Sequence, residues 1–478
     1  ETAVMATASI GIDGTDSDGF YAGIAQFVYD ADDATITLDN SGTISILAEA
    51  NAQGTTDVAA NTADANAFIY AGVFQGASYD DSNHEDDPDV ANATARLVLN
   101  NSGTITIQAL AKATGIRADA SASLHEGMTQ DAFEAADGRA VINNSGSLNL
   151  LVQAVAKGTD YAKAKASNDD PLSQYAAGNG DEGDIASVTL NNTGSLAVIN
   201  LRADATATAN SAMASATFDS GIEQYAEDAG RATVLLTNNG TINVWAQAQA
   251  KGTDKATAYA SITDPLYQSA AGNGDDGDIA KTTLNNTGSL AVINIRADAT
   301  ATARSAVATA KFETGIEQYA NEADEARVAL NNSGTINIIG NAIANGQSNA
   351  EASVYASYGG IWQEATGIED GSLASVSLNN SGTLSLQALA RATAETGEAN
   401  ATATYYYQAF YQGAGEGLLN TVSFDNSGNF DITAMAHAKG ATAAFASAAY
   451  SSPLFSQEVS GTDSDSGEAV AAITNSGD

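Results

Sequence analysis

The sequence predicts an all-β protein, a parallel β-solenoid (β-helix) of about ten coils of roughly 47 residues each. A phrase Asn-(Ser/Thr/Asn)-Gly recurs at nearly even spacing through the 478 residues, and apolar residues alternate with polar ones on both sides of it. The glycines of this phrase at Gly146, Gly240, Gly334 and Gly428 follow one another at 94 residues, so a double coil is the larger repeating unit.

An asparagine stands two residues before the anchor glycine in every copy of the phrase. A position that recurs once per coil becomes a column when coils stack, so we expect the side-chain amides to form a hydrogen-bonded ladder along the axis. We expect the glycine to supply a positive φ for the turn. The predicted ladder consists of Asn40, Asn101, Asn144, Asn192, Asn238, Asn286, Asn332, Asn380, Asn426 and Asn475.

The residues around this turn read as strands of period two. In one coil Leu378 precedes the turn and Leu384 and Leu386 follow it, while Leu190 is followed by Leu196 and Val198 in another. Longer alternations such as 246–250 place alanine at every second position, which predicts two sheets packed closely over small inward side chains.

A second marker follows each long alternation, with a glutamine in its last position. It is clearest in Gly221-Ile222-Glu223-Gln224, and it recurs at Gln268 and Gln318. We expect these glutamines to form a second amide ladder beside the second bend of the coil.

The chain is expected to be one continuous solenoid over residues 1–478, with an incomplete coil at 1–39, an acidic loop insertion at 76–93 and an incomplete coil at 469–478. The single asparagine per repeat favours one flattened coil over two smaller coils of about 23 residues. Because the two incomplete coils look complementary, we expect copies of the chain to stack head to tail.

Composition limits the partners of this protein. The 58 acidic and 18 basic side chains give a formal net charge of −40, which disfavours nucleic acid and anionic membrane as partners. No cysteine is present, so disulfides and thiolate metal sites are excluded. No apolar run is long enough to insert into a bilayer.

The sequence offers little for catalysis. Its histidines, His84, His125 and His437, stand at unrelated points of the repeat, and a solenoid residue contacts mainly its own and adjacent coils. We therefore expect the protein not to be an enzyme. A glycan-cleaving β-helix with a pair of acidic residues is a remote alternative.

Acidic, glycine-rich loops recur at equivalent places in several coils. Alternating carboxylates on a glycine-rich backbone are suited to Ca²⁺, which prefers oxygen ligands. Ordinary solvated turns are the alternative interpretation of these loops. The candidate metal ligands are Asp181, Asp184, Asp275, Asp278, Asp463 and Asp465.

Two features could serve a binding function. One is the acidic insertion that begins after Tyr79, and the other is the cluster Tyr405-Tyr406-Tyr407 with Phe410 and Tyr411. Packing of these tyrosines into the coil is the alternative.

The phrase Leu-Asn-Asn-(Ser/Thr)-Gly-(Thr/Ser)-(Ile/Leu) resembles the repetitive passenger regions of bacterial surface β-solenoids, such as autotransporter and filamentous-haemagglutinin-like adhesins. This resemblance implies display at or beyond a bacterial cell surface, and it transfers no catalytic residues. We expect an extracellular structural protein, a subunit or segment of a head-to-tail filament or surface fibre. A surface adhesin that binds glycan or host ligands is the alternative.

Overall fold

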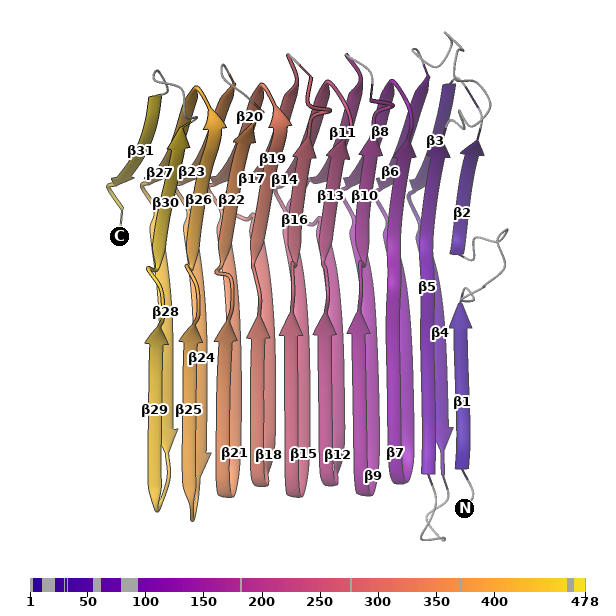
Figure 1. The fold of residues 1–478 in the computed structure, drawn as a ribbon. Helices are drawn as coiled ribbons and strands as arrows, with labels where there is room; N and C mark the ends of the chain where they lie inside the picture. The colour runs from indigo at the N-terminus through magenta and orange to yellow at the C-terminus, as the bar shows by residue number, and fades with distance from the viewer. Residues whose placement is uncertain are drawn as a thin grey trace.

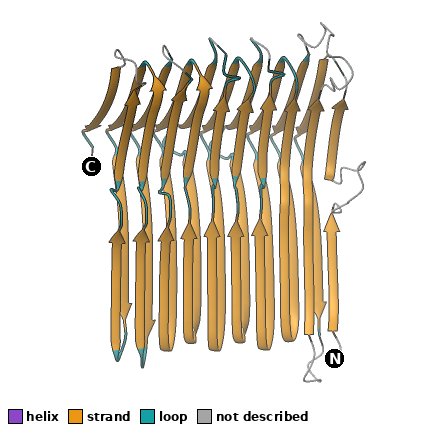
Figure 2. Cartoon of the chain, viewed as in Figure 1, coloured by secondary structure: helices purple, strands orange, loops and turns teal. Residues whose placement is uncertain are grey.

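The computed structural model describes residues 3–10, 22–29, 31, 33–54, 62–78, 93–180, 183–275, 277–368, 372–461 and 468–477. These residues form a parallel β-solenoid, with strands, turns and bends and no helix (Figures 1 and 2). No described helix is available to span a membrane. The predicted fold class is confirmed.

Each coil begins with a short strand that ends at the ladder asparagine. These ten short strands pair in parallel as one sheet, and they lie behind the upper half of the rod in Figure 1. They are β3 (Asp33–Asn40), β6 (Thr94–Asn101), β8 (Asp137–Asn144), β11 (Ile185–Asn192), β14 (Arg231–Asn238), β17 (Ile279–Asn286), β20 (Glu325–Asn332), β23 (Leu373–Asn380), β27 (Leu419–Asn426) and β31 (Glu468–Asn475).

After the asparagine turn the chain runs outward as a first arm, folds back, and returns as a second arm. In six coils both arms belong to one assigned strand: β7 (Thr104–Phe133), β9 (Ser147–Asn168), β12 (Val198–Phe218), β15 (Thr241–Ile262), β18 (Val292–Phe312) and β21 (Thr335–Ala356). Elsewhere the arms are separate strands, β4 (Thr43–Gln53) with β5 (Thr62–Ser78), β24 (Thr383–Ala394) with β25 (Glu398–Tyr405), and β28 (Asn429–Lys439) with β29 (Ala443–Tyr450), while β1 (Ala3–Ile10) is a second arm.

Beyond a bend, a marker strand carries the glutamine and leads to the next short strand. The separate marker strands are β2 (Ala22–Tyr29), β10 (Leu172–Ala177), β13 (Ile222–Glu227), β16 (Leu266–Ala271), β19 (Ile316–Ala323), β22 (Ile361–Gly367), β26 (Phe410–Gly417) and β30 (Phe455–Gly461). In β5 and β7 the marker segment continues the second arm without a break. Each coil is thus one flattened circuit, as the single asparagine per repeat predicted.

The fold-back between the arms depends on glycine and alanine. At Gly252 a Cβ atom would collide with the carbonyl oxygen of Lys255, because the chain reverses between these residues. The inward residues of both arms are mostly alanine, such as Ala248 on the first arm of β15 and Ala258 on its second, and both are fully buried. Small side chains let the arms approach closely, and the resulting core is thin but continuous.

The anchor glycines have two different roles. Positive φ occurs at Gly194 (115°) and Gly288 (106°), but not at the other described anchor glycines. At Gly146 a Cβ atom would instead collide with the carbonyl oxygen of Gly103 in the preceding coil. The prediction of a positive φ at every turn was therefore wrong, because close stacking of turn on turn is what excludes a side chain at most of them.

One strand assignment was also wrong. Leu384 and Leu386 are fully buried as predicted, but Leu196 is 83% exposed and Val198 points outward. The longer turn in that coil moves the strand start to Val198, so Ile199 and Leu201 become the buried residues. A change of one residue in register exchanges the inward and outward faces of a strand.

Candidate functional site

The ten ladder asparagines lie in one column. The Nδ2 atom of each donates to the Oδ1 atom of the asparagine in the following coil at 2.7–2.8 Å, from Asn40 to Asn475. The same nitrogen also reaches a backbone carbonyl, as from Asn192 to Thr241 at 3.1 Å. All except Asn475 are buried. Each coil is therefore held in register by a buried polar group that is fully hydrogen-bonded only when the neighbouring coils are in place.

The glutamines form a second ladder of opposite polarity. Each Nε2 atom donates to the Oε1 atom of the preceding coil, at 2.7–3.0 Å, from Gln75 to Gln26 through to Gln457 to Gln412. The interior members, such as Gln224 and Gln268, are fully buried. The asparagine ladder donates toward the C-terminal end of the rod and the glutamine ladder toward the N-terminal end.

Two adjacent asparagines allow a direct test of the buried ladder. Asn286 is fully buried, whereas Asn285 is half-buried in an outer amide row and accepts a hydrogen bond from Asn331. We expect Asn286→Ala to lower the free energy of unfolding by about 1–3 kcal/mol, because the buried Asn332 Oδ1 atom loses its donor. The Asn238 Nδ2 atom loses its bond to Asn286 but keeps its bond to the Val292 carbonyl. Asn285→Ala is the control and should cost clearly less. Denaturant titration measures both, and equal losses would contradict a special role for burial.

The predicted calcium loops are only partly described. Asp181, Asp463 and Asp465 lie outside the described residues. Asp184 and Asp278 are buried, and their Oδ2 atoms accept backbone N–H groups of Asn179 at 3.0 Å and Asn273 at 3.1 Å. Asp275 is exposed, and its own N–H donates to Asp278 at 3.0 Å. The buried aspartates therefore organise the backbone of their loops.

No group of three or more acidic or histidine side chains within the described ranges is arranged to hold a metal ion. Calcium binding remains a prediction from the sequence. A bound ion should raise the melting temperature by mass action, so melts with calcium and with chelator at matched ionic strength should differ. Identical melts would leave the loops as solvated turns.

The two described histidines are far apart in the stack. His125 lies on β7, where its Nδ1 atom is 2.8 Å from Asp169 Oδ2 and its ring contacts Tyr70. His437 lies on β28, and six intervening coils separate it from β7. His84 is outside the described residues. The described geometry thus brings no two histidines together.

The outer face of the marker strands carries aromatic rings and partly buried carboxyl groups. Tyr175, Tyr225, Tyr267 and Tyr319 form a stripe along the rod, with ring centroids 5.1–6.5 Å apart. Burial among them raises the pKa of Glu223 to about 7, with a further contribution from the charge of Asp170. Burial also raises the pKa of Glu317 to about 7.

The raised pKa values of Glu223 and Glu317 determine how the stability of the folded state changes with pH. A carboxyl group with a raised pKa binds its proton more tightly in the folded state than in the unfolded state. Its stabilising effect is complete below the unfolded pKa near 4.5. The effect is lost as the pH rises through the folded pKa of about 7. We expect the melting temperature to fall between pH 5 and pH 8. The double variant Glu223→Gln/Glu317→Gln should flatten this profile, while Glu398→Gln at an exposed position should not. A melting temperature that rises over this range would contradict the assignment.

The tyrosine cluster divides between core and surface. Tyr405 and Phe410 are fully buried, and the Tyr405 ring stacks on Tyr450 at 5.6 Å. Tyr406 and Tyr407 are about half exposed and stack on tyrosines of the preceding coil. The second candidate binding feature is the acidic insertion after Tyr79. Its residues as far as position 92 lie outside the described part of the chain.

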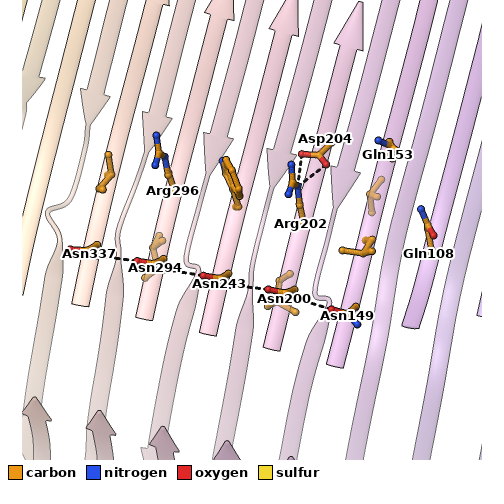
Figure 3. A pocket seen from close by; sticks show the side chains of 16 residues that line it. Gln108, Asn149, Gln153, Asn200, Arg202, Asp204, Asn243, Asn294, Arg296 and Asn337 are labelled. Carbon is orange, nitrogen blue, oxygen red and sulfur yellow. Dashed lines mark hydrogen bonds and ion pairs between the residues drawn. The ribbon is translucent and has the colours of Figure 1, made fainter. Parts of the chain in front are cut away.

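A groove that the sequence did not indicate crosses the outer face of the first arms (Figure 3). Its volume is about 590 Å³, and it extends over β7, β9, β12, β15, β18 and β21. A row of half-buried asparagines, Asn149, Asn200, Asn243, Asn294 and Asn337, forms one side. Trp245, flanked by Arg202 and Arg296 of the neighbouring coils, projects beside it. The asparagine at this position in five successive coils was the available sequence signal.

The two ends of the rod expose strand edges. At the C-terminal end these belong to β28, β29, β30 and β31, and at the N-terminal end to β1, β2, β3 and β4. We call these four-strand surfaces the C-terminal and N-terminal end faces. Apolar side chains are exposed on both, for example Phe445 (63%) and Ile473 (59%) on one and Met5 (69%) on the other.

Comparison with protein-family models, with curated proteins and with solved structures found no match to this chain. Its likeness to bacterial surface solenoids therefore extends to the class of fold, a repetitive parallel β-solenoid.

Proposed function

We propose that this chain is an extracellular structural protein whose solenoid stacks head to tail on copies of itself to build a filament or surface fibre. The observation that carries the proposal is the match between the two end faces. An unpaired edge strand presents backbone N–H and C=O groups that another strand of suitable length can pair with. A contact between unlike ends of identical subunits produces an open filament.

Three of the four strand pairs that would meet agree in length, and the fourth, β30 with seven residues and β2 with eight, differs by one. β28 and β4 have 11 residues each, whereas β29, β1, β31 and β3 have eight each. The parallel register through the stack aligns Ala443 with Ala3, Glu468 with Asp33 and Asn475 with Asn40. A second copy can therefore continue all four edges without a shift in register.

The amide ladders have the right polarity to continue across such a junction. Asn475 ends the asparagine ladder with a donor nitrogen directed away from the rod, and Asn40 of the next copy would supply an acceptor oxygen. The glutamine ladder would continue in the opposite sense, from Gln26 of the next copy to Gln457. A copy added in the reverse orientation would place donor against donor.

Inward-facing residues of the last described strand are uncovered on the C-terminal end face. Ile473 is 59% exposed, although Phe424 and Leu378 in the same column are 3% and 0% exposed. The register places Leu38 of a following copy over Ile473. Burial of such apolar surface contributes about 25 cal/mol per Å², and this supports association through the end faces.

The extracellular and bacterial setting is part of the proposal. It is supported by the resemblance of the turn phrase to surface solenoids. The adhesin alternative is favoured by a separate observation, the groove on the first arms.

Charge at the junction offers a selective test of the filament. In Ile473→Asp a carboxylate would be buried against Leu38 of the next copy, which is strongly unfavourable, so we expect no filaments from this variant. Leu196→Asp places the same change at an exposed position on the flank of the rod and is the matched control. Electron microscopy and light scattering should show unbranched fibres for the unmodified chain and for the control.

Two outcomes would contradict the filament proposal. One is that the unmodified chain remains monomeric at high concentration, as it would if these end faces were covered by further coils of a longer chain. The other is that Ile473→Asp forms the same fibres as Leu196→Asp.

A further inference from the structure

We propose that the groove on the first arms binds an extended neutral polysaccharide whose chain runs along the axis of the solenoid. This inference does not rest on filament formation, because the groove lies on the side of the rod and reaches neither end face.

The shape of the groove favours a linear ligand. It is lined from Gln108 on β7 to Ile339 on β21, across six successive coils. With parallel strands about 4.8 Å apart, this corresponds to a length of about 24 Å. An asparagine recurs at the same position in five successive coils, so this side of the groove presents a row of similar groups to a polymer of similar repeating units.

The half-buried asparagine row of the groove supplies groups that match sugar hydroxyls. Asn200 donates to Asn149, Asn243 to Asn200 and Asn294 to Asn243, each at 2.8–3.0 Å. The final link, from Asn337 to Asn294, is 3.0 Å long. Each interior amide uses one N–H group and one lone pair in this row, so one of each remains for a ligand. A hydroxyl group also donates and accepts, and it can bridge these two groups on adjacent amides.

The Arg-Trp-Arg group is held rigidly before any ligand arrives. The guanidinium carbon of Arg202 lies 4.4 Å from the Trp245 ring centroid, and that of Arg296 lies 5.7 Å from it on the next coil. Trp245 Nε1 donates to Asp298 at 2.9 Å, and Arg202 Nε lies 2.7 Å from Asp204. A fixed aromatic edge and fixed polar groups reduce the ordering cost of binding.

Charge and backbone geometry argue against other polymers. The two arginines of the groove are each paired with an aspartate, so the groove has no net positive charge to attract nucleic acid to a chain of net charge −40. A peptide would bind most readily along a strand edge, but the groove crosses paired strands whose backbone groups are already bonded to one another. A neutral chain of hydroxyl groups suits these conditions.

Calorimetric titration of the full chain with neutral hexasaccharides and trisaccharides of the cello-, chito-, xylo- and manno- series tests the proposal. We expect saturable binding of at least one hexasaccharide and weaker binding of its trisaccharide, because the shorter chain contacts fewer coils. Trp245→Ala and Asn243→Ala should each weaken hexasaccharide binding by about tenfold or more, since each removes a preorganised contact.

Tyr259→Ala is the matched control, because Tyr259 lies on the second arm of the same strand, β15, and faces outward on the opposite side of the rod. It should leave binding unchanged, and thermal melts check that every variant remains folded. Absence of binding to every hexasaccharide at millimolar concentration would overturn the proposal. Hexasaccharide binding that is unaffected by Trp245→Ala would also overturn it. The same holds if no sugar binds and the rods instead associate laterally in a way that Trp245→Ala abolishes.

Discussion

Each interior coil of this protein buries one asparagine and one glutamine side chain that its own residues do not fully satisfy. A buried amide without partners costs several kcal/mol, so each coil depends on correctly aligned coils above and below it. A slip of one residue would remove both ladder bonds and also turn the inward alanines outward. The ladders thus specify register in a molecule whose small, repetitive apolar side chains discriminate poorly between alternative registers.

The rest of the structure is consistent with this constraint. Alanine on both arms gives a thin core, so each coil contributes little apolar burial and stability accumulates through repetition. Among the described residues, Asp184, Asp278 and Asp298 are the acidic side chains that are buried. The formal charge of −40 opposes non-specific aggregation. Outer amide rows, such as the one in the groove, follow from the same stacking: polar residues at equivalent positions of adjacent coils come within hydrogen-bonding distance.

Much of the fold could be predicted because repetition makes the sequence redundant. The asparagine and glutamine columns follow from spacing alone, and Leu384 and Leu386 were placed correctly by alternation. Leu196 was misplaced because its turn is three residues longer than the turn of the preceding coil, and an odd number of added residues exchanges the inward and outward positions of the strand that follows. The groove was missed because Arg202, Trp245 and Arg296 come from three coils, about 43–51 residues apart, and only the register between coils brings them together.

The central claim is that buried side-chain amides hold the coils in register. Hydrogen exchange of asparagine and glutamine side-chain amides, followed by nuclear magnetic resonance, tests it most directly. Exchange of a buried ladder amide requires the coils around it to open. The Asn238 and Gln268 amide protons should therefore exchange as slowly as backbone amides of the core strands, and far more slowly than the half-buried Asn285. Exchange of the ladder amides at the rate of exposed side chains would contradict the account.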